Sequence, residues 1–119
     1  MKVYYAHFVG IYDTKQEERD LNTIKTIFPN AEIINPNNDK HNKGYKQYGM
    51  NYFEILIEEC DVLVFRGCIN NKISTGVYQE INMAKEHYIP VVELPTMLNR
   101  EMSVQETRQM LIELGIRSE

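Results

Sequence analysis

The segment of residues 60–80 restricts the fold most, because a strand, a loop and a helix follow one another within it. Asp61 is followed by the unbroken apolar run VLVF, which is the pattern of a strand covered on both faces in a parallel sheet. After the polar loop 67–73, Ser74 stands where a helix N-cap is expected, and apolar residues then recur at helical spacing. We therefore expect a central parallel strand that leads into a helix.

The rest of the chain repeats this alternation of strands and helices. Thr14 and Glu17 form a T-x-x-E capping box, and Ser103 with Glu106 forms another candidate. Strand patterns cover residues 2–6, 31–35 and 90–95, and helix patterns cover 14–28, about 47 or 49 to 60, and 103–114. The alternation predicts one α/β domain over residues 1–119, with a Rossmann-like open parallel sheet of four to five strands and helices on both faces.

Two segments are predicted as connections, residues 35–49 and residues 97–102. The first is a long polar run that ends the second strand, and it leaves from the same carboxyl edge of the sheet as His7 and Ser74. It is expected to be a long loop that closes over a ligand, or a solvated surface loop. Its candidate side chains are Lys40, His41, Lys43, Tyr45, Lys46 and Tyr48.

Composition excludes several classes of function. A formal net charge of -4 argues against a nucleic-acid groove. Cys60 and Cys68 are predicted to be free thiols, because no further Cys or paired His supplies metal-ligand spacing. No apolar segment suits a signal peptide or a membrane span, so we expect a cytoplasmic protein without cofactor, metal or membrane partner. The first strand is not followed by GxGxxG, which disfavours a dinucleotide-binding domain.

Glu80 is the carboxylate of greatest interest. It lies three residues after Val77 and four before Ala84, and so projects from the apolar stripe of its helix. A helix that follows a central parallel strand begins at the ligand-binding edge of the sheet, so Glu80 can point over the crevice there. The alternative is a carboxylate at the border of the stripe that reaches water.

The run Ser74-Thr75-Gly76-Val77-Tyr78-Gln79-Glu80 resembles a motif of the nucleoside 2-deoxyribosyltransferase superfamily, and most closely that of its nucleoside 5'-monophosphate N-glycosidases. The resemblance spans roughly residues 2–94, but the motif content is confined to this run and Tyr4. It implies that Glu80 attacks or stabilises the anomeric carbon while Tyr4 orients it. Transferases tend to have Asp where this chain has Ser74, whereas the monophosphate hydrolases have Ser.

A physical argument supports a phosphate next to Ser74. An Asp at a helix N-terminus would repel a dianion, whereas a hydroxyl and the amides of Gly76 and Val77 can donate to it. The alternatives are an ordinary N-cap for Ser74 and a tight turn for Gly76.

Three further residues are candidates for the predicted site, and a fourth departs from the family pattern. His7 replaces a small residue of the family and is expected either to meet the base or to be satisfied by backbone, and Asn35 begins the segment predicted to cover the base. Arg66 either binds phosphate, pairs with Glu80, or forms a structural salt bridge. Phe53 stands where the monophosphate hydrolases tend to have Asp, which weakens the match.

The resemblance therefore predicts hydrolysis of the N-glycosidic bond of a ribo- or deoxyribonucleoside 5'-monophosphate, with Glu80 as nucleophile. Two alternatives stay open: a nucleoside deoxyribosyltransferase, and a non-catalytic binding protein for a nucleotide-derived ligand, which the missing Asp favours. Members of the family commonly assemble, so a homodimer or higher homo-oligomer is expected.

Overall fold

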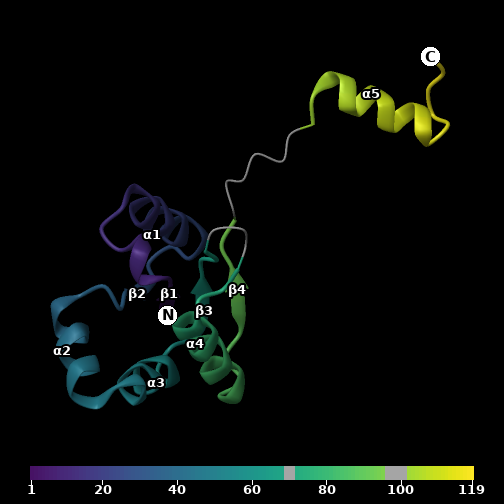
Figure 1. Cartoon of the computed structure of the whole chain (residues 1–119). Helices are drawn as coiled ribbons and strands as arrows, with labels where there is room; N and C mark the ends of the chain where they lie inside the picture. The colour runs from purple at the N-terminus through teal and green to yellow at the C-terminus, as the bar shows by residue number, and fades with distance from the viewer. Residues whose placement is uncertain (69–71, 96–101) are drawn as a thin grey trace.

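The computed structural model describes residues 1–68, 72–95 and 102–119 (Figure 1). Its four strands form one parallel sheet in the order β2-β1-β3-β4. The strands are β1 (Lys2–Ala6), β2 (Glu32–Ile34), β3 (Val62–Phe65) and β4 (Val91–Glu93). All four residues of β3 are buried, so the central parallel strand predicted from the run VLVF is confirmed. Residues 69–71 of the predicted loop and residues 97–101 of the predicted connector lie outside the described residues.

Helices cover both faces of the sheet, which confirms the predicted Rossmann-like α/β fold (Figure 1). Because side chains alternate along a strand, β1 contributes Tyr4 and Ala6 to one core and Val3 and Tyr5 to the other. The first core lies under α3 (Met50–Glu58) and α4 (Thr75–Glu86), and the second lies under α1 (Lys15–Ile27).

The N-terminus of α1 confirms half of its predicted capping box. The Thr14 hydroxyl accepts a hydrogen bond from the Glu17 amide at 3.3 Å. The Glu17 carboxylate does not bond the Thr14 amide in return; it accepts from the Asp13 amide at 3.3 Å and contacts His7. This carboxylate is buried and belongs to a polar network rather than to the cap.

The prediction of a long loop over residues 35–49 is wrong for most of its length, because α2 (Asp39–Tyr48) occupies it. The Asn38 side chain caps α2 by accepting from the Lys40 amide at 2.8 Å. This polar segment is a helix that packs on α3 through aromatic contacts. The ring centroids of Tyr45 and Phe53 lie 5.3 Å apart. Gly44 allows the approach, since a Cβ there would lie 2.4 Å from the ring of Tyr52.

Gly49 separates α2 from α3 with a φ of 67°, a conformation that glycine adopts without steric cost. The helix predicted to begin at residue 47 or 49 therefore begins at Met50, just after this turn. The apolar sequence of this segment suggests Tyr52, Phe53, Ile55, Leu56 and Cys60 as its buried side, but Ile55 is 58% exposed and Ile57 is buried instead. Ile57 packs in the core beneath α3 and α4.

The last helix, α5 (Val104–Glu113), follows the prediction closely. The Ser103 hydroxyl accepts from the Glu106 amide at 3.0 Å, and Gly115 follows the helix with a φ of 74°. Cys60 and Cys68 are free, as predicted. Across the part of the chain described here, no helix is both long enough and apolar enough to cross a membrane.

Candidate active site

The strand order places a crevice between β1 and β3. The chain leaves β1 toward β2 on one side and leaves β3 toward β4 on the other, which is the switch point where open α/β sheets bind ligands. A cavity of about 1050 Å³ opens there, large enough for a small organic ligand. Its lining residues are His7, Phe8, Val9, Tyr12, Asp13, Pro36, Asn37, Asn42, Tyr45, Met50, Phe53, Ser74, Thr75, Gly76, Val77 and Glu80.

Glu80 lines this cavity from the second turn of α4 and is only 7% exposed. The hydroxyl of Tyr4, which is fully buried behind it, donates a hydrogen bond to its Oε2. Burial raises the pKa of Glu80 to about 7, although the hydrogen bond from Tyr4 acts in the opposite direction. Near neutral pH this carboxyl group therefore exists in both protonation states.

Tyr4 is suited to donate to Glu80 at every ordinary pH. Burial, followed by the charge of Glu80, raises the pKa of Tyr4 well above its usual value of 10.0. Its hydroxyl therefore stays protonated and holds one oxygen of the carboxylate in place. The other oxygen, Oε1, is the one that remains for chemistry in the cavity.

The N-terminus of α4 forms another wall of the cavity. Ser74 is the N-cap residue, but its hydroxyl makes no capping hydrogen bond with the first turn. A Cβ on Gly76 would meet no atom within 4 Å, and its φ is not in the left-handed region, so neither packing nor a turn explains the glycine. The amides of this first turn and the Ser74 hydroxyl therefore face a space that can hold an acceptor group.

His7 reaches the cavity, but its ring nitrogens are already occupied. Nδ1 lies 3.1 Å from the carbonyl oxygen of Tyr5, and Nε2 lies 2.7 Å from Oε2 of Glu17. The ring also stacks on Tyr5 with centroids 3.7 Å apart. Burial lowers the pKa of His7, and it outweighs the opposing effect of Glu17. The imidazole side chain is fully buried, so in this arrangement it supports the cavity wall and offers a ligand no free nitrogen.

Arg66 is not brought to the cavity. Its guanidinium makes two hydrogen bonds to the carboxylate of Asp20, at 2.5 and 3.0 Å, and a third to the carbonyl oxygen of Pro95 at 2.6 Å. Asp20 also accepts from the Tyr5 hydroxyl at 2.6 Å. This is the structural salt bridge that the sequence left as one of three alternatives, and it lies on the α1 face of the sheet.

Asn35 also lies outside the cavity lining, but it positions a residue of the cavity wall. Its Oδ1 accepts from the Asn37 amide at 2.9 Å, a turn that places Asn37 in the cavity wall. Asn37 Nδ2 then donates to Asp13 and Glu17, each at 3.0 Å. Of the side chains proposed on the segment 35–49, Tyr45 lines the cavity, whereas Lys40, His41, Lys43, Lys46 and Tyr48 do not.

Several lining residues were not predicted, and Tyr12 is the most informative. Burial raises its pKa to about 12, and the charges of Glu80 and Glu17 add to this effect. The Tyr12 ring lies 4.7 Å from that of His7. The available signal was its position between β1 and α1, because that connection must cross the ligand-binding edge of the sheet. Phe53, by contrast, brings an apolar ring to the wall.

No protein-family model matches the sequence, and a search of curated proteins gives no significant match. The chemistry of the site is therefore read from its own groups. These are a buried carboxyl group on the cavity wall, a tyrosine hydroxyl that orients it, and an uncapped helix N-terminus.

Proposed function

We propose that this protein hydrolyses the N-glycosidic bond of a ribo- or deoxyribonucleoside 5'-monophosphate, with Glu80 as the nucleophile. The observation that carries the proposal is the buried Tyr4–Glu80 pair on the wall of a large cavity at the sheet's switch point. Among the residues that the structure describes, no cation pairs with this buried carboxyl group. Such a group is costly for the fold, and groups of this kind concentrate at functional sites.

In the proposed reaction the carboxylate of Glu80 bonds to the anomeric carbon as its bond to the base nitrogen breaks. The base leaves with the electron pair of that bond and takes up a proton. A water molecule then attacks the same carbon, loses a proton, and releases Glu80 and the sugar 5-phosphate. Tyr4 keeps the carboxylate aligned through both steps by its hydrogen bond to Oε2.

The 5'-phosphate is assigned to the N-terminus of α4. The Ser74 hydroxyl and the amides of Gly76 and Val77 supply donors there, and the helix dipole favours an anion. No Lys or Arg is among the residues that line the cavity in the described part of the chain, so the donors proposed for the phosphate are uncharged. Comparing each nucleotide with its nucleoside measures the contribution of the phosphate directly.

The second candidate is a binding protein for a nucleotide-derived ligand. Phe53 favours it, because an apolar ring lies on the cavity wall where the resembling hydrolases tend to have a carboxylate for the ribose. Aromatic side chains stack on bases without contributing to bond cleavage. In this candidate Glu80 binds a polar group of the ligand instead of attacking it.

The decisive experiment incubates the protein with ribo- and deoxyribonucleoside 5'-monophosphates and with the corresponding nucleosides, and follows free base by chromatography. We expect base release from at least one monophosphate, with at least a 10³-fold loss in the Glu80→Gln variant, since removing a nucleophile typically costs several kcal/mol of transition-state stabilisation. Gln is the matched choice because it keeps the shape of the side chain and a hydrogen-bond acceptor for Tyr4.

Other outcomes separate the alternatives. Base exchange in a mixture with a second free base, without net hydrolysis, identifies a transferase. Thermal stabilisation by a nucleotide without base release identifies the binding protein. Base release that is unchanged in Glu80→Gln contradicts the proposed nucleophile.

We also propose that the protein works in the cytoplasm, since no segment of the sequence suits a signal peptide or a membrane span, and, from the resemblance alone, that it is a homodimer or higher homo-oligomer. Size-exclusion chromatography with light scattering tests the assembly.

A further inference from the structure

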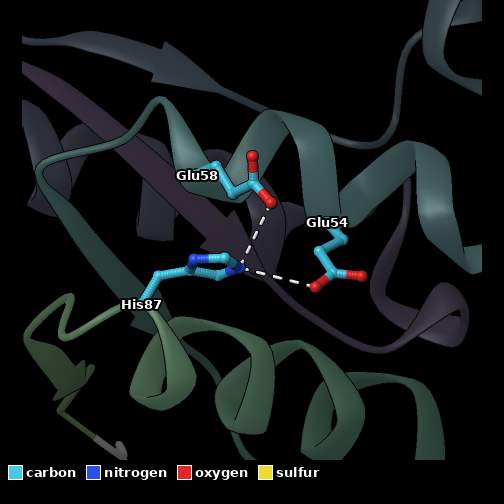
Figure 2. A group of neighbouring side chains, drawn as sticks. All are labelled: Glu54, Glu58 and His87. Carbon is cyan, nitrogen blue, oxygen red and sulfur yellow. Dashed lines mark hydrogen bonds and ion pairs between the residues drawn. The ribbon is translucent and has the colours of Figure 1, made fainter.

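A second cluster of ligand-type side chains lies away from the cavity (Figure 2). Glu54 and Glu58 are one turn apart on α3, and His87 is the C-cap residue of α4. Figure 2 shows the two carboxylates and the imidazole pointing toward one another across the gap between the helices. All three side chains are partly open to solvent, with exposed fractions of 33%, 47% and 34% respectively.

We propose that Glu54, Glu58 and His87 bind one divalent transition-metal ion, and that Zn²⁺ is the ion that fits best. The two carboxylates and one imidazole supply the mixed oxygen and nitrogen donors that zinc accepts in sites with three protein ligands. Solvent reaches the cluster and can provide the fourth ligand. Mg²⁺ and Ca²⁺ fit less well because they favour oxygen donors throughout.

The distances between donor atoms agree with this assignment. Ligand bonds of about 2.0–2.2 Å in a tetrahedral zinc site place neighbouring donor atoms about 3.4 Å apart. His87 Nε2 lies 3.4 Å from Oε1 of Glu54 and 3.2 Å from Oε1 of Glu58. One ligand atom from each of the three residues lies within 4.8 Å of the others. A metal ion can therefore enter with small side-chain rotations.

The local charges also favour a cation. Two carboxylates one turn apart on a helix repel each other, and a cation between them removes the repulsion. His87 lies at the C-terminus of α4, where the helix dipole is negative. In the described part of the chain, the hydrogen bonds and ion pairs of these three side chains are confined to the cluster.

A bound ion would connect the two helices that carry part of the cavity wall. Phe53 precedes Glu54 on α3, and Glu80 lies about two turns before His87 on α4; both line the cavity. The proposed ion is thus a link between α3 and α4 whose three ligands are not among the residues that line the cavity, and it takes no part in the proposed hydrolysis. Its presence should appear in stability rather than in chemistry.

The test is calorimetric titration of the chelator-treated full chain with ZnCl₂. We expect one ion per chain and at least a tenfold loss of affinity in His87→Gln and in Glu54→Gln/Glu58→Gln. His41→Gln is the matched histidine control, because His41 contacts Tyr52 and lies outside the cluster. Glu59→Gln is the matched carboxylate control, because Glu59 lies near Lys2. Neither control should change zinc binding.

A thermal melt gives the second readout. Zinc should raise the Tm of the unaltered chain and of both controls, but not of His87→Gln. Absence of binding up to about 1 mM ZnCl₂ would overturn the proposal and leave only the direct contacts between His87 and the two carboxylates. Equal binding in His87→Gln, or zinc binding that disappears in Cys68→Ser instead, would also overturn it.

Discussion

Two neighbouring tyrosines of β1 each donate a hydrogen bond to a buried carboxyl group, one on each face of the sheet, but the two carboxyl groups have different surroundings. Tyr4 donates its hydroxyl to the carboxylate of Glu80 beneath α4, and Tyr5 donates to the carboxylate of Asp20 beneath α1. Both carboxyl groups are buried, at 7% and 1% exposure. Asp20 also holds the guanidinium of Arg66 through two hydrogen bonds, whereas Glu80 faces the cavity and pairs with no cation among the described residues.

The difference shows how the same tyrosine–carboxyl pair can belong to a fully paired network on one face and can border a cavity on the other. A buried carboxylate paired with Arg is neutralised, and its remaining lone pairs are satisfied. Glu80 has one hydrogen bond within the described residues, from Tyr4, and keeps the cost of its burial, which raises its pKa to about 7. The fold holds a poorly compensated charge at the cavity, as binding and catalytic sites commonly do.

The largest effect on stability should come from the Asp20 pair. Asp20→Asn leaves the Arg66 guanidinium buried without its anion, and we expect it to lower the free energy of unfolding by about 3–5 kcal/mol. Glu80→Gln removes a carboxyl group that has no such partner and should not destabilise the fold at neutral pH. Urea denaturation of both variants measures the contrast. Equal losses in the two variants would contradict the proposed difference between the faces.

The next effect is a pH dependence that belongs to Glu80. A pKa raised in the folded state means that the folded protein binds the proton more tightly than the unfolded chain does. Stability from this group is therefore complete below about pH 4.5 and is lost as the pH rises through about 7. Over this pH range the titration of Glu80 changes the free energy of unfolding by about 3 kcal/mol.

Glu80→Gln removes this dependence. At pH 8 the variant should be more stable than the unaltered protein by up to about 3 kcal/mol, and the difference should vanish toward pH 4.5. Denaturant unfolding of both proteins across this range measures it. A difference that is constant with pH would show that Glu80 titrates normally in the folded protein.

Removing either tyrosine hydroxyl tests the same comparison between the two faces, with a smaller expected change in stability. Each of Tyr4→Phe and Tyr5→Phe should cost about 1–2 kcal/mol of stability through the lost hydrogen bond. Only Tyr4→Phe should alter the site, because the Tyr4 bond lowers the pKa of Glu80 and its loss should raise that pKa further. The pH at which base release reaches half its maximum should then move upward for Tyr4→Phe and stay constant for Tyr5→Phe. A shift in both would mean that the faces are coupled.

The smallest effect concerns Gly76. Alanine fits there without meeting another atom and is the better helix former, so Gly76→Ala should change stability by about +0.5 to +1 kcal/mol. If a phosphate approaches the amides at this position, the added methyl group should weaken nucleotide binding without affecting nucleoside binding. Thermal shifts with a matched nucleotide and nucleoside distinguish the two effects. Equal weakening of both ligands would place the phosphate elsewhere.

The fold was largely predictable because it follows from local patterns. Three features illustrate this: the run VLVF, the cap at Thr14, and the strand β4 between two prolines. Each depends on residues that are close in the sequence. The exception, α2, has a polar sequence typical of a loop, and its helix depends on capping by Asn38 and on aromatic contacts with α3. No short-range pattern reveals contacts between helices.

The site was predictable in part for the same reason. Ser74, Gly76, Val77 and Glu80 share one short motif and line the cavity together. Arg66 was ambiguous because its partner, Asp20, lies on a helix whose charged residues resemble a solvated surface. The pairing of Arg66 with Asp20 connects residues 46 positions apart and depends on the packing of α1 on β3.

The most direct test of the central claim is a titration of the Glu80 side-chain carboxyl carbon by ¹³C NMR, with Glu80→Gln used to assign the signal. The account predicts a midpoint near pH 7 in the folded protein, because burial without a cation raises the pKa. A midpoint at the usual 4.5 would contradict it, because the burial of Glu80 would then leave its pKa unchanged.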